Sequence, residues 1–477
     1  MMLKRLKSKY QSLPILAKAS IAYTIGNIVA KSVGIITVPL FTRVLSTSEM
    51  GVSAIYSSWY NILFAVVTLS LCSGSLSVAM VDYEGKRDEY ESACLFLTTL
   101  SGLFTLILYL LFRPVVESFV MLDSSVFLVL ISNLIFFPAI EFWLVRQRFE
   151  YKYKSIFFVT VSLSLVSAII SIIIVLVLRN CGDVNLGNVK VISQNGVALL
   201  FALFFYILIF LKGKTFVDYH IWKYALKISV PLIVHTLAKS ILDTSDRIMI
   251  SNICGQSDAG IYGTIYNFSL LSLIVWNAIN TSIIPKLFND IKQDRFQSSD
   301  SLVKFITALF GAIAIVFTLL APEIIYFFTT PEYYDAVYLM PALSAGIYLT
   351  AIYNIYGNYL LYRKKTINIM IATVFAAFSN LVMNYVFIYK YGYVAAAYTT
   401  FASFVVLAIV QGVMVRIEYK KRVVSDRTLL KISSVVCLLC IATNALYKVI
   451  LLRYFFVFLF IIILFKKRKT IWATLKR

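Results

Sequence analysis

Charged side chains recur every four positions along one long apolar segment, residues 222–252. Because an α-helix turns once in about 3.6 residues, this spacing places them on one face. A basic group there attracts an anionic ligand and a carboxylate can exchange a cation, so the face could bind both a charged substrate and a coupling ion. The stripe consists of His235, Lys239, Asp243 and Arg247, with Asp246 beside it.

Two interpretations of this stripe stay open. The functional one is a wet face with a cation at mid-depth and a titratable carboxylate beyond it. The structural one is a ladder of ion pairs within the helix, in which Asp243 neutralises Lys239 and Arg247. Both interpretations require that the stripe faces protein or water rather than lipid, because a charged group in the hydrocarbon of a bilayer has an unfavourable free energy.

A shorter stripe lies in the apolar segment 15–42, where Asn27 and Lys31 are four positions apart. Lys31 has no acidic residue three or four positions away, so it needs a partner from another helix, from water or from an anionic ligand. A role facing a cavity and a structural ion pair with Asp243 are the alternatives. The Ala-Lys-Ser sequence at Lys31 recurs at Lys239, which suggests an internal repeat.

Other apolar segments contain isolated polar groups. Glu141 follows Pro138 about one turn before a basic cluster, and it could bind a coupling ion or pair with Arg146. Amides such as Asn277 and Asn354 could join helices or form hydrogen bonds with sugars. These residues complete the candidate substrate-binding and ion-coupling groups.

The composition shows what kind of chain carries these groups. Of 477 residues, 60% are hydrophobic and 14% are charged. The hydrophobic core of a soluble domain stops growing at about 250–300 residues, so a soluble fold could not bury that many apolar side chains. A spanning helix needs about 20 mostly apolar residues. We therefore predict an all-α polytopic membrane protein with about 14 transmembrane helices, at roughly 15–42, 52–80, 92–112, 115–145, 155–178, 190–211, 222–252, 260–288, 302–321, 335–362, 366–389, 393–415, 429–447 and 449–465.

The basic residues test this count, because cytoplasmic loops are enriched in Lys and Arg. With both termini cytoplasmic, 34 of the 44 basic residues lie in inner segments and 7 in outer segments. One helix more or fewer would move every later loop to the other side of the membrane, and basic residues would then be spread over both sides. The net charge of +21 is thereby explained by loops beside anionic membrane lipid, and nucleic acid is not expected as a partner. We therefore predict a multi-pass membrane protein with both termini in the cytoplasm.

The repeated tripeptide and the order of helices indicate two six-helix halves of like orientation. An even number of helices in each half gives parallel repeats, which pack about an axis along the membrane normal with a site between them. We expect an N-terminal lobe at 1–214, a C-terminal lobe at 215–416, and two further helices with a basic tail at 417–477. The lobes would be pseudo-symmetric around a central cavity.

Several enzyme classes lack their motifs here. The sequence around 212–215 resembles a phosphate-binding loop, but position 208 is Leu where Gly is required. No Asp-x-Asp occurs, which argues against a metal-dependent glycosyltransferase. Neither histidine lies near the Cys-x-x-Cys at 437–440, so no metal site is predicted. We expect no cofactor and no enzymatic activity.

Three segments resemble the polysaccharide-biosynthesis flippases of the multidrug/oligosaccharidyl-lipid/polysaccharide exporter superfamily. The first is 41–51, with Phe-Thr-Arg-Val-Leu-Ser followed by Glu-Met-Gly. The second joins Asp-Arg-Ile-Met-Ile at 246–250 to Ala-Gly-Ile-Tyr at 259–262. The third is Asn384 followed by Tyr-Gly-Tyr-Val-Ala-Ala-Ala at 391–397, where the family often has Gly at position 395.

The resemblance implies alternating access and export of a lipid-diphosphate-linked oligosaccharide from the inner to the outer leaflet, as in O-antigen or capsule assembly. It also implies a cationic cavity and coupling to a proton or sodium gradient. By position, Lys31, Lys239 and Arg247 would face the diphosphate or an acidic glycan, and Asp243 or Asp246 would couple the ion. A polysaccharide polymerase and a chain-length regulator would be partners, besides membrane lipid, and the location would be a bacterial inner membrane.

Two alternatives come from other classes. A multidrug exporter of the same superfamily would prefer an acidic, aromatic pocket for cationic drugs, and lysines at mid-depth in both halves argue against it. A membrane polymerase or acyltransferase would place its catalytic residues on a substantial outer loop, whereas the predicted outer loops are short.

Overall fold

The computed structural model describes residues 15–466 apart from 181, 183, 421 and 422. By its internal contacts the chain divides into two compact units, residues 1–240 and 241–477, here called the N-terminal unit and the C-terminal unit. The division falls inside one long helix, α11 (Tyr219–Cys254), beyond the predicted lobe boundary at residue 214. The assignment of six helices to each lobe stays a prediction.

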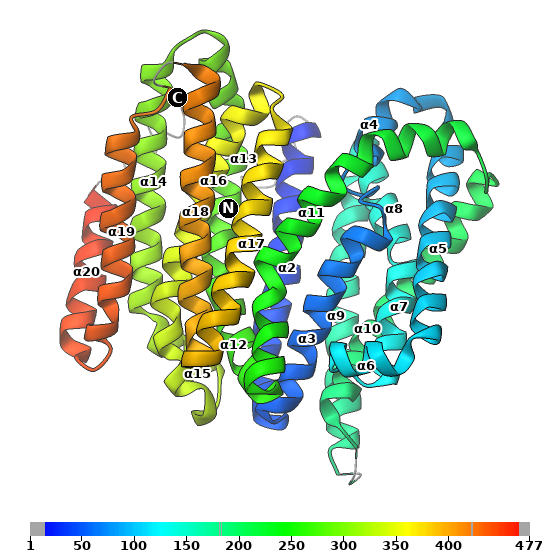
Figure 1. The fold of residues 1–477 in the computed structure, drawn as a ribbon, viewed down its shortest axis with the longest axis horizontal. Helices are drawn as coiled ribbons and strands as arrows, with labels where there is room; N and C mark the ends of the chain where they lie inside the picture. The colour runs from blue at the N-terminus through cyan, green and yellow to red at the C-terminus, as the bar shows by residue number, and fades with distance from the viewer. Residues whose placement is uncertain (1–14, 181, 183, 421–422, 467–477) are drawn as a thin grey trace, which may run out of the picture. The chain divides into compact units, whose positions relative to one another are not determined.

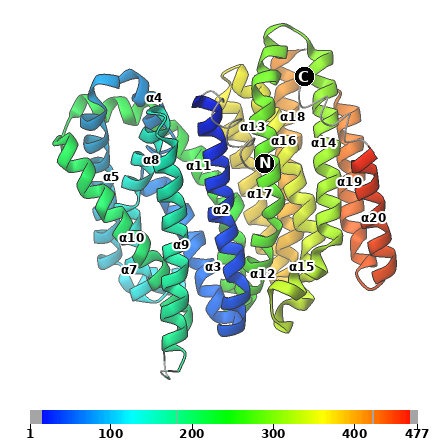
Figure 2. The same cartoon turned by 180° about the vertical axis from the view of Figure 1, so that it is seen from behind.

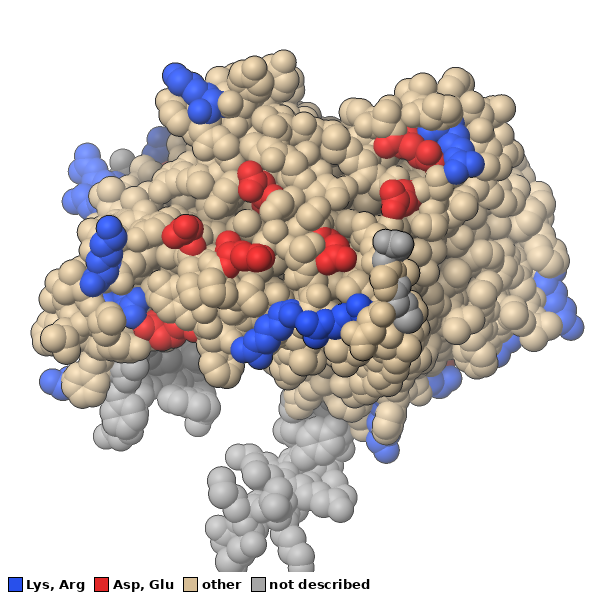
Figure 3. Space-filling view, turned by 90° about the horizontal axis from the view of Figure 1, so that it is seen from below, with Lys and Arg blue, Asp and Glu red and all other residues tan. Residues whose placement is uncertain are grey.

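The described residues form helices and turns and contain no strand, which confirms the all-α prediction (Figure 1). Thirteen helical segments are long and apolar enough to cross a membrane, and the shorter α20 (Ile450–Lys466) is a fourteenth apolar helix. The polytopic membrane fold is therefore confirmed. The side chains seen from below in Figure 3 agree with the low charge of the sequence, since Asp, Glu, Lys and Arg form only small separate patches on that face.

The N-terminal unit contains ten complete helical elements and the first part of α11. Within it α2 packs against α9 and α9 packs against α10, and these helices run side by side (Figure 2). Its elements are α2 (Ile15–Val44), α3 (Thr47–Val67), α4 (Ser75–Asp82), the short 3₁₀ helix η1 (Glu84–Lys86), α5 (Arg87–Leu111), α6 (Arg113–Val120), α7 (Ser124–Phe136), α8 (Pro138–Phe149), α9 (Tyr153–Leu178) and α10 (Leu186–Gly213).

The motif at 41–51 forms the turn between α2 and α3, and its residue types fit that geometry. Ser46 caps α3, and Glu49 three positions later accepts a hydrogen bond from the Ser46 backbone N–H at 2.8 Å. This reciprocal arrangement satisfies backbone donors that a helix start leaves open. The second oxygen of Glu49 accepts the N–H of Leu186 at 2.9 Å. The turn is thereby tied to the start of α10.

The predicted span 52–80 is broken in the middle. Between α3 and α4 the chain unwinds, and Leu69 and Ser70 have φ values of 51° and 49°, in the left-handed region. Ser229 of α11 accepts the freed N–H of Ser75 at 3.0 Å. Gly74 passes so close to Ser229 that an added Cβ would lie 2.6 Å from the hydroxyl oxygen. Irregular backbone at membrane depth requires such replacement hydrogen bonds.

The predicted span 115–145 also differs from the structure. Its first residues form the separate short helix α6, and the spanning segment begins at Ser124. Arg113 and Ser124 donate hydrogen bonds to Glu117 at 2.9 and 2.5 Å, which close the turn after α6. The bond from Ser124, together with those from Arg113 and Tyr109, lowers the pKa of Glu117 to about 2.

The C-terminal unit is built around α16, whose span is almost wholly buried. Helices α18, α19 and α14 pack against α16, and α17 packs against α18 (Figure 1). The apolar side chains of α16 therefore form the centre of this unit. Its elements after α11 are α12 (Gln256–Ser269), α13 (Leu271–Lys292), α14 (Phe296–Leu319), α15 (Ala321–Phe328), the 3₁₀ helix η2 (Pro331–Leu339), α16 (Met340–Tyr362), α17 (Thr366–Tyr391), α18 (Val394–Tyr419), α19 (Asp426–Leu446) and α20.

Candidate transport site

Asp246 is the most completely enclosed carboxylate among the predicted site residues. It is 1% exposed and lies inside the C-terminal unit. Three neutral groups donate hydrogen bonds to it, Tyr262 at 2.7 Å, Thr400 at 2.6 Å and Asn384 at 2.6 Å. No described Lys or Arg forms an ion pair with it. A buried carboxylate held by neutral donors alone keeps its charge available for a cation or a proton.

A second layer of polar groups holds these donors in place. The side-chain N–H of Asn384 also reaches the amide oxygen of Asn380 at 3.0 Å, and Thr399 donates to the amide oxygen of Asn384. Ser245 donates to the same Asn380 oxygen at 3.4 Å. The amide nitrogen of Asn380 is buried without a hydrogen-bond partner. The network thus joins α11, α12, α17 and α18 through oxygen-rich side chains.

Asp246 and Arg247 are neighbours in sequence but differ in surroundings, because successive helix residues are about 100° apart. The Arg247 guanidinium lies over the ring of Tyr266, 4.3 Å from its centre, and donates a hydrogen bond to the backbone oxygen of Asp243 at 3.0 Å. Arg247 is 7% exposed. No ion pair joins it to a carboxylate of the described residues, so the Asp243–Arg247 pair of the alternative, structural interpretation is not formed.

The N-terminal unit contains four of the predicted substrate-binding residues. Asn27 and Lys31 are both exposed on one face of α2, as their spacing predicts. In the described part of this unit no ion pair neutralises Lys31. His235 and Lys239 lie one turn apart on α11 and are half-buried, and Nδ1 of His235 is buried without a hydrogen-bond partner. Two basic side chains are thus placed on membrane-spanning helices of this unit.

Glu141 does not pair with Arg146, and that prediction is wrong. Arg146 instead donates hydrogen bonds to Asp88, to Glu91 at 3.0 Å and to Glu150 at 2.6 Å. Five positions correspond to about 140° around a helix, so the side chains of 141 and 146 point in different directions. Glu141 is half-buried, and its ion-coupling role stays a prediction.

Among the described residues, no hydrogen bond joins the two predicted amides of the C-terminal unit to the Asp246 network. Asn277 on α13 is exposed, and Asn354 on α16 is half-buried. Nearby on the same helices, Asn358 donates a hydrogen bond to Asn280 at 3.0 Å. Amides therefore join α13 and α16 here, while Asn277 and Asn354 keep their roles in substrate binding as predictions.

Sequence reasoning missed some polar residues of both units. Thr399, Thr400 and the hydroxyl of Tyr262 were not recognised as partners of Asp246, although they lie in or beside two of the family-like motifs. In the N-terminal unit a cavity of about 220 Å³ lies between α2, α9 and α10. Its polar lining consists of Thr37, Ser164, Ser167, Gln194 and Asn195. These residues are scattered singly through apolar helices, so no spacing pattern marked them.

Comparison with known proteins identifies the family. A family model described as "Polysaccharide biosynthesis protein" matches residues 16–290, and a second one, MatE, matches residues 231–386. A protein of the Lsg locus of Haemophilus influenzae is 23% identical over 356 residues, covering 73% of this chain and 85% of that protein.

Solved structures show the same fold. The lipid II flippase MurJ, in an inward closed conformation, matches with a TM-score of 0.71 at 18% identity, over 94% of this chain and all of that one. A MOP superfamily transporter from Pyrococcus furiosus matches with a TM-score of 0.59 at 15% identity, over 85% of this chain and 95% of that one. These relatives are named as a flippase and a transporter rather than as enzymes. Since the first family model covers more than half of the residues, the chain belongs to the polysaccharide biosynthesis protein family.

Proposed function

We propose that this protein moves a polyprenyl-diphosphate-linked oligosaccharide from the cytoplasmic to the outer leaflet of a bacterial inner membrane, for surface polysaccharide such as O-antigen or capsule. Family membership supports a role in polysaccharide biosynthesis. The observation that carries the proposal is the pair of lysines on spanning helices, Lys31 on α2 and Lys239 on α11. An intramembrane cation marks a substrate path by default, and a diphosphate is a dianion that such groups attract.

Alternating access is the expected mechanism. The substrate head group would enter from one side, bind Lys31, Lys239 and Arg247 with help from Asn27, His235, Asn277 and Asn354, and leave on the other side. The polyprenyl tail would stay in the lipid throughout, because removing it from hydrocarbon costs about 0.8 kcal/mol for each CH₂ group. The protein then needs to provide only a polar path for the sugar and phosphate.

Asp246 is the proposed coupling residue. Its carboxylate, the hydroxyls of Tyr262 and Thr400 and the amide of Asn384 converge within hydrogen-bond distance. The carboxylate and the two hydroxyls offer the oxygen ligands that hard cations prefer, while Asn384 presents its side-chain N–H, and the same carboxylate can instead take up a proton. Binding of either ion would neutralise a buried charge on α11, the helix that also carries Lys239 and Arg247. A proton or sodium gradient is the proposed energy source.

A second candidate function is a cation-coupled multidrug exporter, which the MatE match over residues 231–386 favours. Substrates of such exporters are commonly cationic, and like charges repel. The exposed cation of Lys31 therefore argues for an anionic substrate instead.

A deletion strain separates the two functions. We expect loss of surface polysaccharide, with complete lipid-linked repeat units accumulating on the cytoplasmic leaflet. Intact surface glycan with a new sensitivity to drugs would instead support the exporter. Single repeat units stranded on the outer leaflet would point to a polymerase and contradict the proposal.

A further inference from the structure

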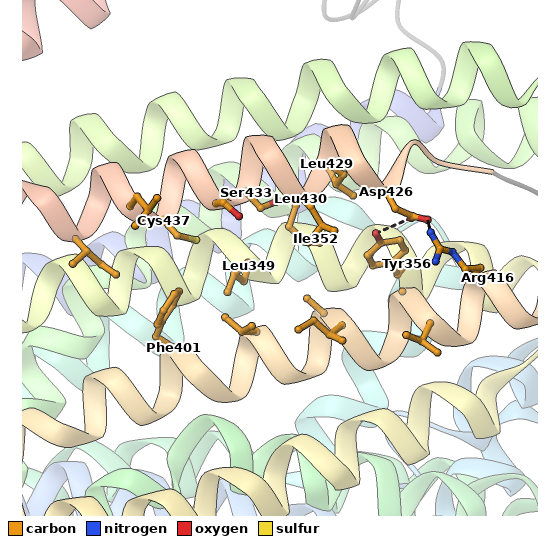
Figure 4. Close-up of a pocket in the computed structure, with 18 residues that line it drawn as sticks. Leu349, Ile352, Tyr356, Phe401, Arg416, Asp426, Leu429, Leu430, Ser433 and Cys437 are labelled. Carbon is orange, nitrogen blue, oxygen red and sulfur yellow. Dashed lines mark hydrogen bonds and ion pairs between the residues drawn. The ribbon is translucent and has the colours of Figure 1, made fainter.

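An apolar groove runs along the C-terminal unit, separate from the Asp246 network. Its volume is about 500 Å³, and it lies between α16, α18 and α19 (Figure 4). The buried side chains of Leu349, Ile352 and Tyr356 on α16 contribute to its lining. On α18 it extends from Phe401 to Arg416, fifteen positions that correspond to about 22 Å of helix. The groove is therefore long and narrow.

Polar groups are unevenly distributed along this groove. Apart from Ser433 and Ser434 on α19, its polar side chains gather at one end, where Arg416, Asp426 and the hydroxyl of Tyr356 meet (Figure 4). Exposed apolar side chains, including Ile409 at 54% and Leu438 at 67%, also line it. One charged end and a long apolar channel are the features of a site for an amphiphile.

The charged end of the groove has hydrogen-bond donors that could bind an anion. Arg416 donates one hydrogen bond to Asp426 at 2.8 Å, and its side chain is 67% exposed. A guanidinium has five N–H donors, so this ion pair fixes its direction and leaves donors for a phosphate. Lys420 and Arg427 are exposed on the segments beside it. Basic residues clustered at a membrane surface attract anionic lipid.

We propose that this groove binds one anionic glycerophospholipid of the surrounding bilayer, with an acyl chain along α18 and α19 and its phosphate on Arg416. The length and apolar lining fit a single acyl chain. The excess of basic over acidic groups at the charged end selects an anionic head group over a zwitterionic one. The lipid acts as a bound ligand of the C-terminal unit, and its binding does not depend on the identity of the transported substrate.

Native mass spectrometry of the full-length protein in detergent tests this. Phosphatidylglycerol and phosphatidylcholine with identical acyl chains are added separately, and retained lipid is counted. We expect one phosphatidylglycerol to stay bound at collision energies that remove phosphatidylcholine. Arg416→Gln should lower phosphatidylglycerol occupancy about fivefold, the effect of one basic group near a lipid surface. Ser434→Phe should block the apolar channel and lower the occupancy of both lipids.

Each variant has a matched control. Arg148→Gln removes the same charge from an exposed residue of α8, away from the groove and its charged end, and Val435→Phe adds a ring to the next residue of α19, which is 54% exposed and does not line the groove. Both controls should bind lipid as the unmodified protein does. Equal losses in test and control variants would overturn the proposal, as would equal retention of the two lipids or retention of a polyprenyl phosphate in place of phosphatidylglycerol.

Discussion

Asp246 and Asn384 lie 138 positions apart in the chain, yet the side-chain N–H of Asn384 donates a hydrogen bond to the Asp246 carboxylate at 2.6 Å. This contact joins α11 to α17 inside the C-terminal unit, where neither side chain is exposed. A hydrogen bond to a buried charged group stabilises a protein by about 1.5–3 kcal/mol. The carboxylate is thus held in one position, as an ion-binding group must be.

Replacement of Asp246 by Asn should uncouple transport from the ion gradient. The amide keeps the size of the side chain but cannot bind a proton or balance a cation. In proteoliposomes we expect the gradient-driven rate to fall to the rate without a gradient. Asp335→Asn removes an exposed carboxylate from the same unit and should leave coupling unchanged. Full gradient dependence in the Asp246 variant would show that the coupling site lies elsewhere.

Replacement of Lys31 or Lys239 by Gln should reduce substrate translocation at least about tenfold, because each lysine would lose a charge-assisted hydrogen bond of about 1.5–3 kcal/mol to the diphosphate. Membrane insertion should be normal, as judged by protein level and chromatographic profile. Lys390→Gln, an exposed residue at the end of α17, is the matched control. If both variants restore normal surface polysaccharide in the deletion strain, these lysines do not bind substrate.

The break between α3 and α4 can be tested through Gly74. Gly74→Ala would bring a methyl group to within 2.6 Å of the Ser229 hydroxyl oxygen and 3.0 Å of the Ser70 carbonyl oxygen. Overpacking of this kind costs about 1–3 kcal/mol, so the thermal unfolding temperature in detergent should fall. At Gly196, inside α10, an added methyl meets no atom within 4 Å. Gly196→Ala should therefore raise stability or leave it unchanged, and equal losses in both variants would mean that the close approach to Ser229 is unimportant.

Arg146 should be a main stabilising residue of the N-terminal unit. Its loss would leave Glu91, which is 2% exposed, as a buried charge without its partner. Breaking a buried pair costs about 3–5 kcal/mol, and the partial exposure of Arg146 favours the lower end. Arg146→Ala should therefore unfold at a clearly lower temperature than Arg148→Ala, which removes an exposed neighbour. Similar unfolding temperatures would refute this role of the cluster.

Hydropathy was sufficient to predict the helices, because spanning segments must satisfy their own backbone hydrogen bonds and carry apolar side chains. The break after Val67 gave no such signal, since the residues around it are as apolar as those of an intact span. What stabilises the break is a set of hydrogen bonds to α11, more than 150 positions away. Hydrogen bonds between residues so far apart in the chain leave no signal in the local sequence.

The site was predictable only in part, for a similar reason. Spacing predicted that Asn27 and Lys31 share a face, and the structure confirms this. Spacing could not show which carboxylate pairs with an arginine, so Glu141 was one candidate partner of Arg146, whereas Arg146 binds Glu91 on α5. The partners of Asp246 come from α12, α17 and α18, and only the packing of these helices brings them together.

The central claim is tested most directly by the purified protein in proteoliposomes that contain a fluorescent polyprenyl-diphosphate oligosaccharide. Labelled substrate that reaches the opposite leaflet is detected by its sensitivity to an added quencher. We predict translocation that requires the protein, increases with an ion gradient and is lost in the Lys31→Gln and Lys239→Gln variants. Equal quenching with and without the protein would contradict the flippase function.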